Sequence, residues 1–283
     1  MKFLKIGLNT SIQDLGRKGA RKWGIGSSGA MDQFSLQSLN AFLNKPVESA
    51  CLEFTFPAPE ILFEEEVTFC NYGADFGPRL NDSPILIGKI YHTKPGDTLR
   101  FTRHQSGMWS YLGFAGSVES ERWLGSYSQN EKLVHPSLPK ILKIKAEYFN
   151  RSGILPPLKS REKIRFVPGK YCTNIPNETF TIDASSNRMG YRLKGPALTG
   201  YKEQISFPVE RGCIQLLPDG QLVVLMSESQ TTGGYPLWGW VVDIDALSQL
   251  KPGQSFFWEK ISAEEAWEIN QKKKEFFQKL AWK

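Results

Sequence analysis

The sequence has no long hydrophobic run, and this lack excludes the simplest membrane architectures. No stretch approaches the ~20 consecutive apolar residues that a membrane-spanning helix needs. Residues 1–8 carry the charge of a signal peptide, but only a few apolar residues precede Asn9 and Thr10, fewer than the roughly 7–15 of a secretory core. We therefore interpret these residues as a first β-strand and expect a cytoplasmic protein that does not bind a membrane.

Cysteine and histidine are scarce, which argues against metal and disulfide chemistry. The four cysteines are far apart and form no C-x-x-C pair, and the three histidines have neither metal-ligand spacing nor a cysteine partner. We expect buried, reduced thiols and no bound metal. The sequence also lacks the G-x-x-x-x-G-K-[ST] pattern of a P-loop, so we expect no ATP site of that type on this chain.

What the sequence does contain is material for a packed core. It has 283 residues, 40% of them hydrophobic and 23% charged, with a formal net charge of +6. This length fits two domains or one large one. Short β-type runs separated by Gly and Pro turns dominate the chain, a pattern typical of barrels and sandwiches. We expect strands at residues 51–56, 60–63, 67–71, 84–90, 98–103, 108–114, 163–167, 179–183, 213–217, 222–226, 237–242 and 255–258.

Helical patterns are few, and a weak internal repeat indicates duplication. We expect helices over residues 31–43 and from the capping box at Ser262 to the end of the chain. The string Lys-Pro-Gly at residues 94–96 recurs at 251–253, an offset of 157, and Met31 corresponds to Met189, an offset of 158. Two similar offsets predict a duplicated β domain, with one domain over residues 1–155 and a second, which carries the C-terminal helix, over 160–283.

The glycine-rich loop at residues 24–29 matches G-x-G-x-x-G, but a dinucleotide site needs a strand before the loop and a βαβ series after it, and both are missing here. A serine nucleophile of the amidase type would need a lysine far upstream. What remains is a loop preceded by Arg17, Lys18, Arg21 and Lys22. It fits a solvated basic loop or a small-anion site. No aromatic-interleaved basic stripe supports nucleic-acid binding.

Two further segments could bind a small polar ligand. The loop at residues 230–236 places Gln230, Thr231, Thr232 and Gly233 directly after an apolar strand, and it could otherwise be a polar turn. Arg188, followed by Tyr191, joins a guanidinium to a glycine turn. Two acids, Glu53 and Asp75, lie inside apolar strands, where an acid is usually paired or functional.

Five motifs in order resemble the family of the C-type subunit of 5-oxoprolinase, also called the Kip antagonist, allophanate hydrolase subunit 2 or biotin-dependent carboxyltransferase family. The resemblance extends from about residue 5 to residue 260. Its motifs are Ser-Ile-Gln-Asp-Leu-Gly-Arg at 11–17, Ser-Gly-Ala-Met-Asp at 28–32, Gly-Ala-Asp at 73–75, Arg-Met-Gly-Tyr-Arg at 188–192 and Gln-Thr-Thr-Gly-Gly-Tyr-Pro at 230–236.

The resemblance implies a mainly β fold of two tandem cyclophilin-like β-barrels with a few short helices. It implies a subunit, inactive alone, of a complex that uses ATP to hydrolyse 5-oxo-L-proline to L-glutamate. Its partners would be an A-type subunit and a Kip inhibitor-like B-type subunit, and no biotin attaches to this chain. On this basis we expect substrate or anion binding by Arg17, Arg188, Tyr191, Gln230, Thr231, Thr232 and Gly233, and catalytic acids or orienting groups at Asp14, Asp32, Glu53 and Asp75.

Two alternatives stay open. The chain could be a regulatory protein of the Kip-antagonist type that sequesters the B-type partner, or a carboxyltransferase-like module acting on urea or allophanate. One stretch departs from the family pattern, because Gly-Ser-Tyr-Ser-Gln at 125–129 stands where the family has Gly-Ser-Arg-Ser-Thr, and the glycine-rich segment that follows is shortened into residues 130–145. The missing arginine removes a potential anion contact.

Overall fold

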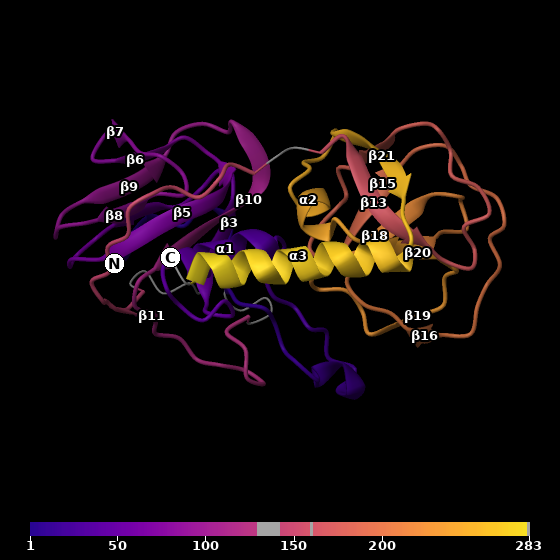
Figure 1. The fold of residues 1–283 in the computed structure, drawn as a ribbon, viewed down its shortest axis with the longest axis horizontal. Coiled ribbons are helices and arrows are strands. Elements are labelled where there is room, and N and C mark those ends of the chain that lie inside the picture. The colour runs from indigo at the N-terminus through magenta and orange to yellow at the C-terminus, as the bar shows by residue number, and fades with distance from the viewer. Residues whose placement is uncertain (129–141, 159–160, 282–283) are drawn as a thin grey trace. The chain divides into compact units, whose positions relative to one another are not determined.

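The chain folds into mainly β structure with few helices, as the sequence predicts (Figure 1). The computed structural model describes residues 1–128, 142–158 and 161–281. These divide into two compact units. The first comprises Met1–Gly16, Asp32–Lys159 and Glu275–Lys283, and the second comprises Arg17–Met31 and Ser160–Lys274. Each unit is thus built from separate stretches of sequence, whereas we had predicted contiguous domains, whose boundaries stay a prediction.

The first unit contains two five-stranded sheets and a small ribbon. One sheet has the order β1 (Lys2–Lys5), β4 (Glu60–Leu62), β9 (Thr98–Phe101), β6 (Pro78–Leu80) and β7 (Ser83–Pro84). The other has the order β2 (Leu8–Gln13), β3 (Cys51–Thr55), β10 (Ser106–Phe114), β5 (Thr68–Asp75) and β8 (Ile90–His92). The ribbon pairs β11 (Ser117–Val118) with β12 (Ile144–Lys145).

Alternating apolar side chains from these strands form the core of the first unit, in which Phe54, Phe63 and Phe69 are fully buried. The helix α1 (Gln33–Phe42) packs against β5 and β10. Gly113 allows this close approach, because a Cβ there would lie 2.9 Å from the Leu39 side chain.

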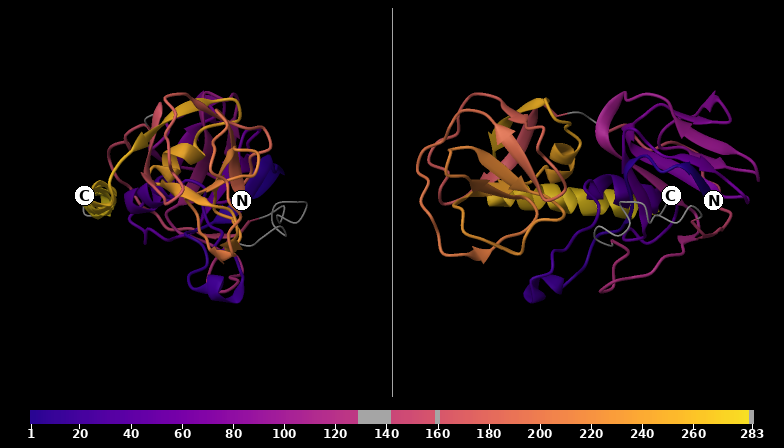
Figure 2. Two further views of the ribbon diagram at one scale, coloured as in Figure 1. Left: turned by 90° about the vertical axis from the view of Figure 1, so that its right-hand side faces the viewer. Right: turned by 180° about the vertical axis from the view of Figure 1, so that it is seen from behind.

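The second unit, whose barrel strands are coloured from salmon to yellow in Figure 2, contains a closed barrel. The parallel pair β13–β21 joins the two ends of its strand order. The order is β13 (Lys163–Pro168), β20 (Leu237–Val241), β17 (Cys213–Leu216), β18 (Leu222–Leu225), β15 (Gly190–Lys194), β14 (Phe180–Ile182) and β21 (Ser255–Lys260). The unit also contains the 3-10 helix η1 (Ala20–Trp23), α2 (Ile244–Ser248) and the ribbon of β16 (Phe207–Pro208) and β19 (Thr232–Gly233).

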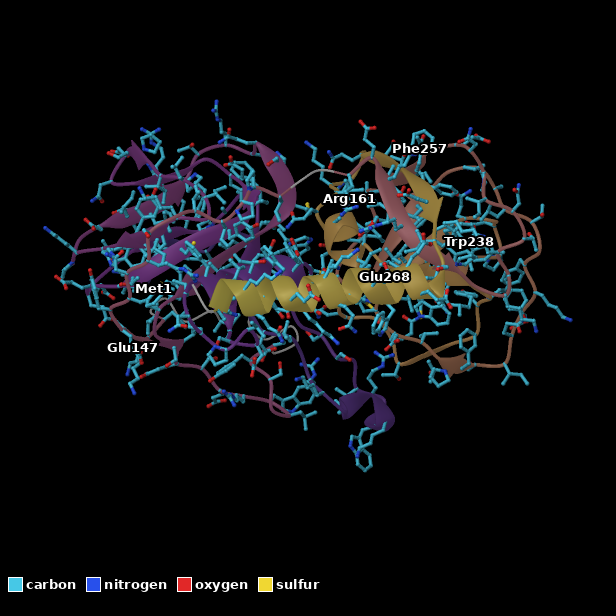
Figure 3. The ribbon with its side chains drawn as sticks, viewed as in Figure 1. Met1, Glu147, Arg161, Trp238, Phe257 and Glu268 are labelled. Carbon is cyan, nitrogen blue, oxygen red and sulfur yellow. The ribbon has the colours of Figure 1, made fainter. Side chains whose placement is uncertain are left out.

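Aromatic rings fill the barrel. Trp238 of β20 (Figure 3) stacks on Phe166 with centroids 4.7 Å apart, and Trp258 lies 5.1 Å from the Phe166 centroid. On the outer face a second, smaller apolar cluster contains Cys213, Val209 and Leu225 and lies against Phe207 and Leu237. This cluster matters below because two of its residues, Cys213 and Leu237, are strand neighbours of the buried polar residue Gln215.

The C-terminal helix α3 (Ala263–Ala281) begins at the predicted capping box: the Ser262 amide donates to Glu265, and the Glu265 amide donates to the Ser262 hydroxyl. Its residues through Lys274 count with the second unit and those from Glu275 with the first. Phe276 stacks on Phe34, with centroids 5.4 Å apart. Within the described ranges, no helix combines the length and the apolar character that crossing a membrane requires.

One strand prediction is wrong. Residues 84–90 form no continuous strand: β7 ends at Pro84, β8 begins at Ile90, and a turn lies between them. Gly88 adopts a φ of 78°, and its amide donates to the Asn71 carbonyl, so the chain turns where the apolar pattern had suggested extension. Within the stretch that departs from the family pattern, residues 129–141 lie outside the described residues.

Candidate functional site

The glycine-rich segment at residues 17–31 belongs to the second unit, together with the closed barrel. Arg17 connects the start of this segment to its glycine-rich loop. The Arg17 amide donates to the Ser27 carbonyl at 2.7 Å, and its Nε donates to the Gly26 carbonyl at 3.1 Å. Arg17 is only 1% exposed, so it is not part of a solvated basic loop. Its predicted role in anion binding stays a prediction.

Arg21 connects this segment to the loop at residues 230–236. Its guanidinium donates to the carbonyls of Gln230 and Thr231, at 3.2 and 3.3 Å. A Cβ on Gly26 would lie 3.0 Å from the Ser229 carbonyl, so glycine is the residue that fits this approach. The two loops that the sequence suggested separately as ligand-binding segments are therefore neighbours in one site.

Arg188 lies in the turn before β15 and links three segments. Its Nε donates to Glu228 Oε1 and its Nη2 donates to the Gly29 carbonyl, both at 2.7 Å. Both partners of the ion pair are largely buried, with side-chain exposures of 13% for Arg188 and 27% for Glu228. Asp183, the acid nearest to Arg188 in the sequence, pairs with Lys194 instead. The protein thus holds a carboxylate where we predict that a substrate carboxylate binds.

The remaining predicted binding residues differ in their surroundings. Gln230 is exposed, and Thr232 and Gly233 form β19 beside β16. Thr231 is anchored through its carbonyl, which accepts from the Val209 amide. Tyr191 does not belong to this group of loops: it is 3% exposed, and its hydroxyl donates to the Ser248 carbonyl at 3.0 Å. This bond connects β15 to α2, and a binding role for Tyr191 stays a prediction.

Several neutral polar atoms in the second unit are buried without a hydrogen-bond partner among the described residues. They include the hydroxyls of Ser28 and Ser229 and both amide atoms of Gln215. Buried polar groups are nearly always paired, and an unpaired one destabilises the fold by about 1–3 kcal/mol. Such atoms beside two glycine-rich loops are typical of a site whose partner is a ligand.

The four predicted acids lie in the first unit, and two of them share one buried network. The Tyr111 hydroxyl donates to Glu53 Oε2 and accepts from the Asp32 amide, both at 2.7 Å. The Asp32 carboxylate caps α1 by accepting from the Ser35 amide and hydroxyl. Burial, followed by the charge of Glu53, raises the pKa of Tyr111 well above its usual value, so this phenol stays protonated. Sequence reasoning had not singled out Tyr111.

The other two acids organise turns. Asp14 accepts hydrogen bonds from the Ser126 and Ser128 hydroxyls and from the Tyr127 amide, at 2.6, 2.9 and 2.8 Å. It thereby fixes the segment that departs from the family pattern. Asp75 accepts from the Gly77 amide at 2.8 Å and from Gln105 Nε2 at 3.1 Å. Catalytic roles for all four acids stay predictions.

This geometry suits the binding of a polar ligand better than catalysis by this chain alone. The loops supply backbone carbonyls, hydroxyls, carboxamides and the guanidinium groups of Arg17, Arg21 and Arg188. In the part of the chain that the structure describes, no group of three or more His, Cys, Asp or Glu side chains could hold a metal ion.

The comparisons with known proteins agree with the sequence motifs. A family model for the carboxyltransferase domain, subdomain A and B, matches residues 23–260. The chain belongs to this carboxyltransferase family. It is 31% identical over 305 residues to the C-type subunit of 5-oxoprolinase from Escherichia coli (strain K12), a match that covers 100% of this chain and 98% of the relative. The corresponding protein of Haemophilus influenzae is 29% identical, and that match covers 95% of this chain and 94% of the relative.

Segments of larger proteins are also similar to this chain. Urea amidolyase of Saccharomyces cerevisiae is 25% identical to 91% of this chain, which corresponds to 16% of that protein. The crystal structure of the Kluyveromyces lactis urea carboxylase superposes with a TM-score of 0.84 at 22% identity over 99% of this chain and 29% of that one. The chain spans about half or less of the solved structures that it matches. These structures confirm the fold.

Proposed function

We propose that this chain is the C-type subunit of an ATP-dependent 5-oxoprolinase complex that hydrolyses 5-oxo-L-proline to L-glutamate. The observation that carries the proposal is the match to the corresponding E. coli protein, which extends over 100% of this chain and 98% of the relative. Because the relative is matched almost end to end, the proposal concerns the role of that whole protein rather than of one part of it.

In this proposal the second unit binds the substrate. Residues 230–233 form hydrogen bonds with the polar atoms of the substrate through their hydroxyl, carboxamide and backbone groups. Arg188 binds the substrate carboxylate with its planar guanidinium, in exchange for Glu228, which it contacts at 2.7 Å. Arg17 supports this role from the buried base of the glycine-rich loop, through its bond to the Gly26 carbonyl.

In this proposal the acids of the first unit act as catalytic acids or as groups that orient other residues. Glu53 is our first candidate among them, because the hydrogen bond from the buried Tyr111 hydroxyl keeps its carboxylate in one geometry. Asp32 positions the start of α1. Asp14 and Asp75 each order the turn to which they are hydrogen-bonded.

The complex would supply what this chain lacks. We propose that an A-type and a Kip inhibitor-like B-type subunit assemble with it, that the complex consumes ATP, and that it works in the cytoplasm, where ATP is available. No biotin would attach to this chain, since no A-M-K-M-like sequence occurs in it.

A second candidate is a carboxyltransferase-type module acting on urea. The similarity to yeast urea amidolyase supports it, although at lower identity and over 16% of that protein. The two candidates differ in their substrate, so one assay separates them.

The test is a glutamate-release assay on the reconstituted complex. The three subunits are combined with 5-oxoproline with and without ATP, and each subunit is omitted in turn. ATP-dependent glutamate release that requires this chain supports the proposal. Turnover of urea in place of 5-oxoproline would favour the second candidate.

A further inference from the structure

Gln215 on β17 is a fully buried side chain with no hydrogen-bond partner for either amide atom among the described residues. It is 0% exposed, and both its Nε2 and its Oε1 are unpaired. In the strand register it lies between Val223 of β18 and Leu237 of β20. Because it alternates with the buried residues Ile214 and Leu216, its side chain lies on the other face of β17 from theirs.

The surroundings of Gln215 would suit a hydrocarbon better. Its strand neighbour Cys213 belongs to the outer apolar cluster, and Leu237 packs against the same cluster. A carboxamide without partners in such a place destabilises the fold, whereas a leucine of similar size would not. The fold alone therefore gives no reason for glutamine at position 215.

The position of Gln215 beside a predicted binding loop gives such a reason. A Cβ on Gly233 would lie 2.8 Å from Gln215 Nε2, and Gln230 Nε2 would lie 3.6 Å from the same point. The carboxamide thus lies directly under the Thr-Gly-Gly segment, in the short ribbon of β16 and β19, whose register has two residue pairs.

We propose that the Gln215 carboxamide recognises the cis-amide edge of the substrate. A carboxamide offers a donor and an acceptor side by side, and its complement is an N–H and a C=O on the same edge of a ligand. A lactam ring holds its amide in this cis arrangement, and urea offers the same edge, whereas a trans amide points the two groups in opposite directions. Because Gln215 is fully buried, access of a ligand to this edge would require β19 to lift from β16, a ribbon of two residue pairs.

This inference rests on the proposed function, because it names how the same site recognises its substrate, but binding tests it separately from turnover. The probes are 5-oxoproline and N-methyl-5-oxoproline, which lacks the N–H, titrated calorimetrically into the reconstituted complex without ATP. The variants are Gln215→Leu and Gly233→Ala, whose new methyl group would displace the carboxamide. The control is Gln254→Leu, the same change at an exposed position of the second unit.

We expect Gln215→Leu to bind 5-oxoproline about ten- to a hundredfold more weakly and to melt at the same or a higher temperature. Gly233→Ala weakens binding in the same direction, and Gln254→Leu binds as the wild type does. N-methylation weakens binding to the wild type about tenfold or more, but has little further effect on Gln215→Leu. This coupling would not arise from a merely structural residue.

Two results would overturn the inference: wild-type affinity in Gln215→Leu, or equal loss on N-methylation in both proteins. A lowered melting temperature with unchanged affinity would mark Gln215 as structural. Binding that depends on Gln215 without glutamate release would leave the inference standing and refute the proposed function. Glutamate release without coupling between N-methylation and the Gln215 variant would support the proposed function and refute the inference.

Discussion

Replacing Arg188 by alanine separates the two roles that its surroundings allow. The side chain makes two charge-assisted hydrogen bonds of 2.7 Å, to the Glu228 carboxylate and to the Gly29 carbonyl. Such a bond contributes about 1.5–3 kcal/mol, less where water reaches it. With side-chain exposures of 13% and 27% for the ion pair, we expect a loss of stability of roughly 2 kcal/mol if the role is structural.

If Arg188 also binds the substrate carboxylate, the kinetics change as well. The loss of one charge-assisted hydrogen bond then raises KM for 5-oxoproline by about ten- to a hundredfold. Arg188→Lys restores only part of this, because an ammonium cannot reproduce the planar fork. The assays are thermal unfolding of the chain and steady-state glutamate release by the complex.

The Glu228→Gln variant is the matched control. It removes the same ion pair but keeps the guanidinium, so we expect it to lower the melting temperature without raising KM. If Arg188→Ala and Glu228→Gln lower stability equally and both leave KM unchanged, the binding role of Arg188 is refuted and only the salt bridge remains.

Three further predictions concern other parts of the chain. The isolated chain, assayed with 5-oxoproline and ATP, releases no glutamate; turnover by the chain alone would refute the subunit assignment. Tyr111→Phe removes the hydroxyl that donates to Glu53 and lowers the unfolding free energy by about 1–3 kcal/mol in denaturant titrations; an unchanged midpoint would contradict this. Burial opposes ionisation of Asp245, but Lys273 and Arg211 outweigh it and lower its pKa to about 2. Since the pKa in the unfolded chain is higher, near 3.9, this stabilisation is present above about pH 4 and is lost as pH falls toward 2. Asp245→Asn should flatten that part of the stability profile.

Much of the fold could be predicted because it depends on local patterns. Alternating apolar residues between Gly and Pro turns located most of the strands, and the capping box located the start of α3. The polar strand Leu8–Gln13 gave no such signal, and it forms because β3 pairs with it. Residues 187–192 were interpreted as a glycine turn that could bind a ligand, yet the barrel strand β15 begins within them, at Gly190.

The site was harder to predict because its contacts are long-range. The loops at 17–31 and 230–236 could each be recognised from their glycines and polar residues, but nothing local indicates that Arg21 reaches the Gln230 carbonyl. Glu228 gave no signal as the partner of Arg188, 40 residues away. Gln215 stands in an apolar strand, and its unpaired state depends on what packs over it. A polar residue inside an otherwise apolar run was the one available signal.

The central claim is that this chain is an obligatory part of a 5-oxoprolinase. The most direct measurement is ATP-dependent glutamate release from 5-oxo-L-proline by the complex assembled with and without this chain. We expect glutamate release that stops when the chain is omitted and returns when the purified chain is added back. Equal release without the chain, or none from the full complex while urea is consumed, would contradict the claim.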